Sequence, residues 1–257
     1  MQVDLRPRSF GELVGLTFSL SVAHFAKLFP LSLLLSAPGL AMTFYQKQLD
    51  PVEDVGLIVA TGFGGMLLAM AIWPLAAAAS IKIVASSYTG TRCSLGEGLA
   101  VGLRRLMPLL GCVMAVGMLV GLGALLFLVP GLIMMTNYYV APCSVVLENQ
   151  GVGASMRRSK KLCDGHRWRV FFLILVVTLL VQFVPGMGLG ILLEMGIVGG
   201  GAFLVTLVVM AAFAIPSIIA PTVVFFDLRV RKEALDVAML SDLVDQIGKT
   251  VGKRAAS

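Results

Sequence analysis

The longest uncharged stretch in the chain is LMPLLGCVMAVGMLVGLGALLFLVPGLIMMTNYYVAPCSVVL, residues 106–147. A helix crosses the hydrocarbon layer of a bilayer with about 20 apolar residues, rising 1.5 Å per residue. This stretch is therefore long enough for two crossings. Four further uncharged stretches, at residues 28–46, 55–81, 170–193 and 195–226, are each long enough for one.

The composition leads to the same class of protein. Apolar residues make up 58% of the 257 residues and charged residues only 13%, against about 25% charged residues in an average soluble domain. A soluble fold of this composition has too few polar side chains to cover its surface. Because lipid offers no hydrogen-bond partners to the backbone, and the runs lack the alternation of barrel strands, the spans are predicted to be helices.

The sequence therefore predicts an all-α integral membrane protein with six transmembrane helices in a single polytopic domain, residues 1–248. The predicted segments are an interfacial helix at 9–27, spans at 28–46, 55–81, 108–129, 131–147, 170–193 and 197–226, a cytoplasmic amphipathic helix at 228–248 and a flexible tail at 249–257.

The basic residues predict the orientation. Of the 20 Lys and Arg residues, only Lys47 falls in the loops on the side opposite the termini, beside Asp50, Glu53 and Asp54. Cytoplasmic loops carry the excess of Lys and Arg, so both termini are expected in the cytoplasm. A cleaved signal peptide is the alternative for the first apolar run. The 27 residues before that run are half apolar and too many for an ordinary n-region, which favours a retained span.

Weak internal similarity suggests a unit used three times: an interfacial helix, a span, an outer turn and a second span. Ser9 and Glu12, and again Ser94 and Glu97, have the S-x-x-E spacing of a helix capping box. A third segment, residues 151–168, has the same place and length without that pair. The sequence thus predicts three related hairpins with cytoplasmic amphipathic interfacial helices. Such repeats occur in transporters, although duplication of a hairpin also simply enlarges a bundle.

Glycine and proline add two expectations. The pairs Pro130-Gly131 and Pro185-Gly186 are expected in hairpin turns, because proline ends a helix and glycine permits the turn. Glycines four residues apart are expected where helices pack closely. These are Gly117 with Gly121, Gly186 with Gly190, and Gly196 with Gly200.

The most basic interfacial segment is predicted to contact lipid headgroups. A helix of this kind lies in the headgroup layer and attracts anionic lipid, although the same charges also serve to set the topology. The predicted headgroup-contacting residues are Arg157, Arg158, Lys160, Lys161, Arg167, Trp168 and Arg169.

The C-terminal helix is the predicted docking element. Leu235, Met239, Leu243 and Ile247 recur every four residues, which places them on one face of a helix. This face is expected to dock on the loops, on lipid or on a protein partner.

The sequence predicts no catalytic, cofactor-binding or metal-binding residues and no nucleic-acid partner. His24 and His166 stand alone, and Cys93, Cys112, Cys143 and Cys163 lack metal-binding spacing, so they are expected to be free thiols. The span interiors contain no charged residue, which disfavours ion-coupled transport but leaves a passive or lipid pathway open. The net charge of +6 follows from the topology.

Two stretches carry a family resemblance. The first comprises Val129-Pro130-Gly131-Leu132, Tyr139, Pro142, Val145-Val146-Leu147-Glu148, Arg158-Ser159, Leu162, Gly165-His166 and Trp168-Arg169. The second is Phe225-Phe226-Asp227-Leu228-Arg229-Val230-Arg231-Lys232-Glu233 with Leu235-Asp236. They resemble the family that includes the membrane domain of glycerophosphoryl diester phosphodiesterases and many stand-alone prokaryotic membrane proteins, over residues 5–240.

The resemblance implies a membrane domain whose enzymatic relatives keep their chemistry in a separate soluble domain. Too few residues follow the last predicted span for such a domain, so we expect no enzyme activity. The leading hypothesis is a bacterial or archaeal inner-membrane accessory or scaffold protein that contacts anionic lipids and a protein partner. The alternatives are a transporter or lipid-handling protein, and a regulatory membrane partner of a separately encoded phosphodiesterase.

Overall fold

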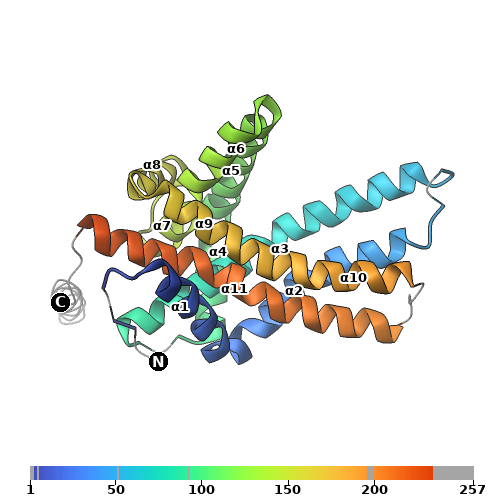
Figure 1. Ribbon diagram of the computed structural model, residues 1–257, viewed down its shortest axis with the longest axis horizontal. Coiled ribbons are helices and arrows are strands. Elements are labelled where there is room, and N and C mark those ends of the chain that lie inside the picture. Colours follow the sequence, from blue (N-terminus) through green and yellow to red (C-terminus); the bar gives the residue numbers. More distant parts are fainter. Residues whose placement is uncertain (1–2, 5, 51, 92, 196–199, 234–257) are drawn as a thin grey trace, which may run out of the picture.

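The computed structural model describes residues 3–4, 6–50, 52–91, 93–195 and 200–233. They form helices and the connections between them (Figure 1). The helices are α1 (Phe10–Ala23), α2 (Phe25–Gln46), α3 (Val55–Thr89), α4 (Leu95–Arg104), α5 (Leu106–Leu126), α6 (Leu128–Tyr138), α7 (Ala141–Leu147), α8 (Val152–Cys163), α9 (Arg167–Thr178), the π-helix η1 (Leu179–Phe183), α10 (Val184–Glu194) and α11 (Gly200–Glu233).

Within the described residues, six helical segments are long and apolar enough to cross a membrane, as predicted. They are α2, α3, α5, the pair α6 and α7, the continuous run α9–η1–α10, and α11. Each of α1, α4 and α8 precedes a pair of these segments, in the order predicted for the unit. The relatedness of the three units stays a prediction.

Both predicted capping boxes are present. The Ser9 hydroxyl accepts a hydrogen bond from the Glu12 backbone N–H, and the Glu12 carboxylate accepts one from the Ser9 backbone N–H. Ser94 and Glu97 make the same pair of bonds at the start of α4. Each box satisfies two N–H groups that a helix start leaves without intrahelical partners. At α8 the N-cap is Gly151, which makes no such side-chain bond.

The short helices are packed against the spans. Leu13, Leu16 and Leu20 of α1 are buried, and α1 contacts α11. Helix α4 lies on α3, and α8 lies on α5, α6 and α7. The C-terminal part of α3, from Ala76 to Tyr88, is buried almost throughout, whereas Phe63 and other apolar side chains of its N-terminal part are exposed. The tightly packed core therefore lies at the end of the molecule that holds the short helices.

Several boundaries differ from the prediction. The expected interfacial helix at 9–27 ends at Ala23, and His24 separates it from α2. Helix α3 continues past residue 81 to Thr89 because the packed core surrounds its last turns. Residues 228–233, expected in a separate amphipathic helix, continue α11 from the last span. The rest of that helix and the predicted tail lie outside the described residues.

The Pro-Gly expectation was wrong for both pairs. Pro130 and Gly131 lie in the first turn of α6, and the chain reverses at the extended residue Phe127. Proline is tolerated at this point because N–H groups in the first turn of a helix have no intrahelical acceptor. Pro185 and Gly186 lie inside the run of helix from η1 into α10.

The glycines at which helices pack closely also differ from the predicted ones. A Cβ added at Gly117, Gly121, Gly186, Gly190 or Gly200 would meet no atom within 4 Å, and Gly196 lies outside the described residues. The close approaches instead join α4 to α3 and α5 to α6. A Cβ at Gly98 would lie 2.9 Å from the Ala79 Cα, and one at Gly131 would lie 2.8 Å from the Ala124 N.

Candidate functional site

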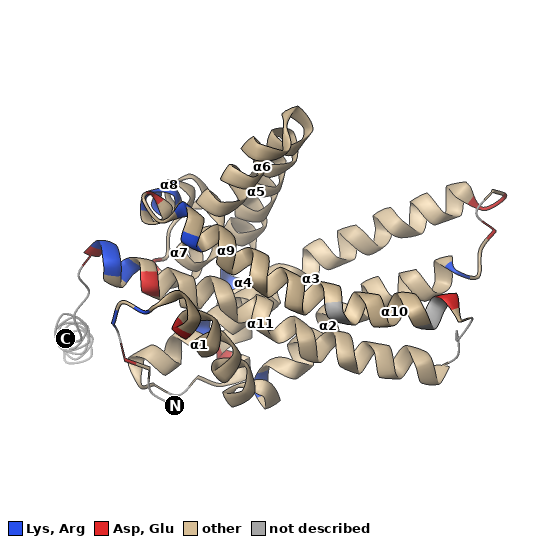
Figure 2. Cartoon of the chain, in the orientation of Figure 1, with Lys and Arg blue, Asp and Glu red and all other residues tan. Residues whose placement is uncertain are grey.

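Basic side chains gather at one end of the molecule, which we call the basic end. Figure 2 shows Lys and Arg on α8, at the start of α9, at the end of α11 and on the N-terminal arm. The uncharged α5–α6 hairpin and the outer parts of the other spans extend away from this end. The loop between α2 and α3, described at 47–50 and 52–54, lies away from the basic end and carries Lys47 with three acidic residues.

Five of the seven predicted headgroup-contacting residues are exposed at the basic end. These residues, which we call the basic surface, are Arg157, Lys160, Lys161, Arg167 and Trp168. The opposite face of α8 is buried against the spans through Ser155, Ser159, Leu162 and Cys163. The amphipathic character of α8 thus comes from a small, packed face and a cationic, exposed face.

Trp168 and Arg167 mark where the basic surface meets the span. Trp168 is 74% exposed and stacks beside Phe172, with ring centroids 6.1 Å apart. Tryptophan favours the membrane–water interface, where its ring lies among headgroups. Arg167 pairs with the exposed Asp164, with Nη2 and Oδ1 3.0 Å apart. This carboxylate offsets the unfavourable position of an arginine at the positive end of the α9 dipole.

Arg158 faces the interior of the molecule. Its Nε and Nη2 donate to the Glu148 carboxylate at 2.9–3.1 Å, and its Nη1 pairs with Glu233. Arg229 pairs with Glu233 at 3.0 Å and lies over the Phe225 ring. The hydrogen bonds to Glu148 raise the pKa of Arg158. This group, the Glu148 cluster, joins the α7–α8 junction to the end of α11.

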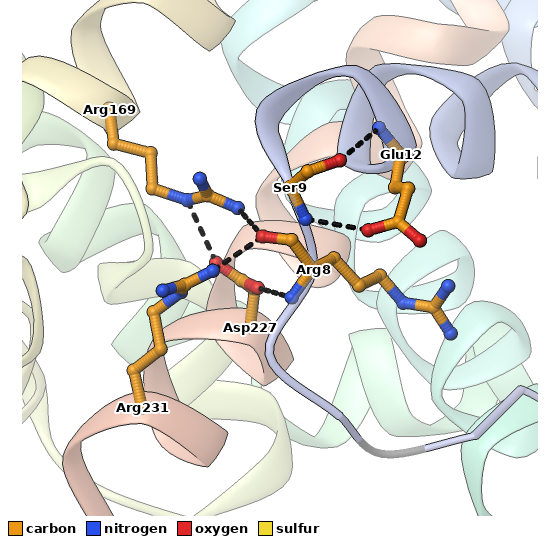
Figure 3. A network of polar contacts seen from close by, with 6 residues as sticks. All are labelled: Arg8, Ser9, Glu12, Arg169, Asp227 and Arg231. Atoms are coloured by element: carbon orange, nitrogen blue, oxygen red, sulfur yellow. Dashed lines mark hydrogen bonds and ion pairs between the residues drawn. The ribbon is translucent and has the colours of Figure 1, made fainter.

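Arg169 belongs to a second group, the Asp227 cluster (Figure 3). The Asp227 side chain is 2% exposed, and its Oδ2 accepts hydrogen bonds from Arg169 Nε at 3.1 Å and Arg231 Nε at 3.0 Å. Its Oδ1 accepts one from the Arg8 backbone N–H at 3.1 Å. Both guanidinium groups also donate to the Arg8 carbonyl oxygen. The cluster therefore joins the N-terminal arm, the start of α9 and the end of α11.

The residues of the resemblance form both clusters. Seven residues of those two stretches each make an ion pair in the structure: Glu148, Arg158, Arg169, Asp227, Arg229, Arg231 and Glu233. Bidentate arginine–carboxylate bonds are directional as well as strong. The motif residues thus hold together helix ends that are far apart in sequence.

Sequence reasoning missed the cluster partners because most contacts are long-range. Only the i, i+4 pairs Asp227–Arg231 and Arg229–Glu233 have a local signal, the spacing of neighbours on one helix face. Exposed Lys232 was also not predicted as part of the site, although it lies next to Gly165 on the basic end.

The two histidines and four cysteines occupy separate structural positions. His24 Nε2 lies 2.6 Å from the Ser87 hydroxyl, and burial lowers the His24 pKa. His166 is the N-cap residue of α9. The cysteines are buried free thiols. Among the residues that the structure describes, no group of three His, Cys, Asp or Glu side chains has a geometry that could hold a metal ion.

A cavity of about 810 Å³ lies between the spans. Its walls come from α2, α3, α5, α6, α7, η1, α10 and α11, and the residues that line it are uncharged. The cavity is partly open, and the α5–α6 hairpin, which forms one wall, diverges from α2, α10 and α11 (Figure 1). Its volume is in the range of sites that hold small molecules.

The helices, their lengths and their apolar surfaces define an all-α multi-pass membrane protein. Comparison with family models, curated proteins and solved structures finds no match to the chain.

Proposed function

We propose that the chain is a non-enzymatic accessory or scaffold protein of a bacterial or archaeal inner membrane. Its basic end faces the cytoplasm and binds anionic lipid headgroups. The observation that carries this proposal is the basic surface, where Arg157, Lys160 and Lys161 are exposed beside Trp168 at the start of a span. Polybasic segments next to a span attract anionic lipid at about 1 kcal/mol per residue.

The ion pairs of Arg158 and Arg169 narrow the set of residues that we propose to contact lipid. Arg158 and Arg169 satisfy their guanidinium groups within the Glu148 and Asp227 clusters. Releasing either one would remove one arginine partner from a largely buried carboxylate, Glu148 or Asp227, which is costly. Headgroup contact is therefore assigned to the five residues of the basic surface.

The accessory role is favoured over ion-coupled transport by the lining of the cavity. The residues around the cavity are uncharged, whereas ion pathways through membranes are usually marked by ionisable side chains. The family resemblance supports a membrane domain that holds no catalytic chemistry of its own. We assign partner docking to the C-terminal segment on the basis of its four-residue apolar spacing.

The prediction of headgroup binding is tested by two variants that are substituted at the same four positions. Replacing Arg157, Lys160, Lys161 and Arg167 with glutamine is expected to lower the ratio of anionic to zwitterionic lipid retained on purification by about tenfold or more. The control exchanges Lys and Arg at the same four positions, so the charge is kept. Native mass spectrometry measures the ratio in both.

An unchanged ratio in the glutamine variant, together with normal retention in the control, would refute headgroup binding at the basic surface. The same spectra test the accessory role: a protein bound at fixed stoichiometry supports it, and its absence from preparations that retain lipid argues for a protein acting alone.

The orientation is tested by two introduced cysteines. Val52→Cys, at an outer-loop residue that is 82% exposed, is expected to react in intact cells with a membrane-impermeant maleimide. Lys161→Cys is expected to react only after the membrane is opened. If Lys161→Cys reacts in intact cells and Val52→Cys reacts only after the membrane is opened, the termini lie outside the cytoplasm.

The unmodified protein is a suitable control for this labelling because its four cysteines are buried. Burial also raises the pKa of Cys93, and it raises the pKa of Cys163 to about 12. Because the thiolate is the reactive form, the background reaction of these two cysteines at neutral pH is expected to be low.

A further inference from the structure

We propose that the cavity between the spans binds an acyl chain of a membrane lipid. This inference is independent of headgroup binding at the basic end, because it concerns a different surface at a different depth. It begins from where the cavity lies. Ser36 and Met210 line the cavity, and they are near the middle of the uncharged runs 28–46 and 195–226. Val116 also lines it and is the middle residue of α5. The cavity therefore lies at the level of the hydrocarbon layer.

The chemistry of the walls selects an apolar occupant. Leu40, Val116, Met135, Val181, Met210 and Ile218 line the cavity, with a few hydroxyl and amide groups among them. An ion or a phosphate placed there would lose its hydration without gaining an opposite charge, which is unfavourable. Apolar cavities stay dry and take up apolar molecules. Methionine side chains adapt to flexible ligands.

Access from the bilayer selects the acyl chain among apolar molecules. The cavity is partly open, and its α5 wall belongs to the hairpin that diverges from α2, α10 and α11 (Figure 1). Met114, Met118 and Leu122 of the same helix are exposed. Acyl chains are the apolar molecules present at the highest concentration beside such a surface.

Irregular helix segments border the cavity. Gln182 of the π-helix η1 lines it, as does Pro221 of α11, and Pro38 of α2 adjoins the lining residue Gly39. Single π-turns and prolines inside helices interrupt the regular ladder of backbone hydrogen bonds. Regular straight helices would pack more closely, so these interruptions contribute to the space between the spans.

Trp73 provides a reporter inside the cavity. It lines the wall, and the only other tryptophan of the chain is Trp168, on the basic surface. In a Trp168→Phe background, all tryptophan fluorescence comes from Trp73. The protein is reconstituted into vesicles of zwitterionic phosphatidylcholine with brominated acyl chains, because bromine quenches tryptophan on contact. Zwitterionic lipid makes the result independent of any anionic headgroup site.

Matched glycine variants distinguish quenching by an acyl chain inside the cavity from quenching by the lipid that surrounds the protein. Gly117 and Gly39 line the cavity, and a Cβ added at either meets no atom within 4 Å. A side chain added at either position therefore starts in open space, so we choose Gly117→Leu and Gly39→Leu to fill the cavity from two different helices. Gly121→Leu is the control, because Gly121 is on the same helix, has the same open space and does not line the cavity.

The expected result is strong quenching of Trp73 that falls at least twofold in Gly117→Leu and in Gly39→Leu but is unchanged in Gly121→Leu. Equal quenching in all folded variants would show that bromine reaches Trp73 from outside the cavity and would overturn the proposal. Quenching of Trp73 by iodide in water, in place of brominated chains, would show a water-filled cavity and would overturn it as well. Having two filling variants keeps the test decisive if one of them does not fold.

Discussion

Replacing Asp227 with asparagine is expected to destabilise the protein more than any other single polar substitution at the basic end. The Asp227 side chain is 2% exposed and accepts hydrogen bonds from Arg169, Arg231 and the Arg8 backbone. Asparagine keeps the size but removes the negative charge that both guanidinium groups share. Breaking a buried ion pair from one side costs about 3–5 kcal/mol. We therefore expect the midpoint of thermal unfolding in detergent to fall by on the order of 10 °C.

Asp164→Asn is the matched control for this substitution. It removes the same charge from an exposed ion pair, in which the Arg167 side chain is 44% exposed and the Asp164 side chain 65% exposed. Surface ion pairs of this kind contribute only about 0.2–1 kcal/mol. Its unfolding midpoint should stay within a few degrees of the unmodified protein. A similar small change for Asp227→Asn would mean that packing of the apolar core, and not the Asp227 cluster, holds the N-terminal arm and the two helix ends together.

Gly98→Ala is expected to have the second large effect, because it separates α4 from α3. The new Cβ would lie 2.9 Å from the Ala79 Cα and 3.1 Å from the Ala79 carbonyl oxygen. These are backbone atoms of a buried helix segment and cannot turn aside as a flexible side chain can. Overpacking of this kind costs about 1–3 kcal/mol. Thermal unfolding in detergent, followed by tryptophan fluorescence, measures the loss.

Gly96→Ala tests the same chemistry in the same helix without the clash. A Cβ at Gly96 meets no atom within 4 Å, and alanine is favoured over glycine in helices by up to about 1 kcal/mol. The expected sign is therefore opposite: a neutral or slightly stabilising change at Gly96 and a loss at Gly98. If both substitutions stabilise the protein, the contact between α4 and α3 is looser than the structure shows.

Local sequence patterns predicted the elements that depend on local interactions. The uncharged runs at 28–46, 55–81 and 106–147 predicted spans because a backbone in lipid must satisfy its own hydrogen bonds. The capping boxes at Ser9 and Ser94 were predicted because both partners lie within one helical turn. The cationic segment was predicted because charge is visible in the residues themselves, and five of its members are exposed as a group.

Sequence patterns that predict contacts between helices were less informative. Gly117 and Gly121 have the spacing of a helix contact but face open space, whereas Gly98 and Gly102 meet α3. Spacing places residues on one face of a helix, but it does not say what covers that face. For the same reason, nothing in the sequence distinguishes Arg157 from Arg158. In the structure Arg157 is exposed, whereas Arg158 pairs with Glu148 and Glu233.

The sequence by itself determined that the chain is a six-span helical membrane protein with all Lys and Arg residues but Lys47 on one side, because hydropathy, helix caps and charge act over one or two turns. The tertiary structure decided which of the basic side chains are exposed and where the glycines pack. It also joined Asp227 to Arg8 and Arg169, and it left a cavity between the α5–α6 hairpin and the other spans. These features depend on contacts between residues that are far apart in the chain, and such contacts exist only once the helices are assembled.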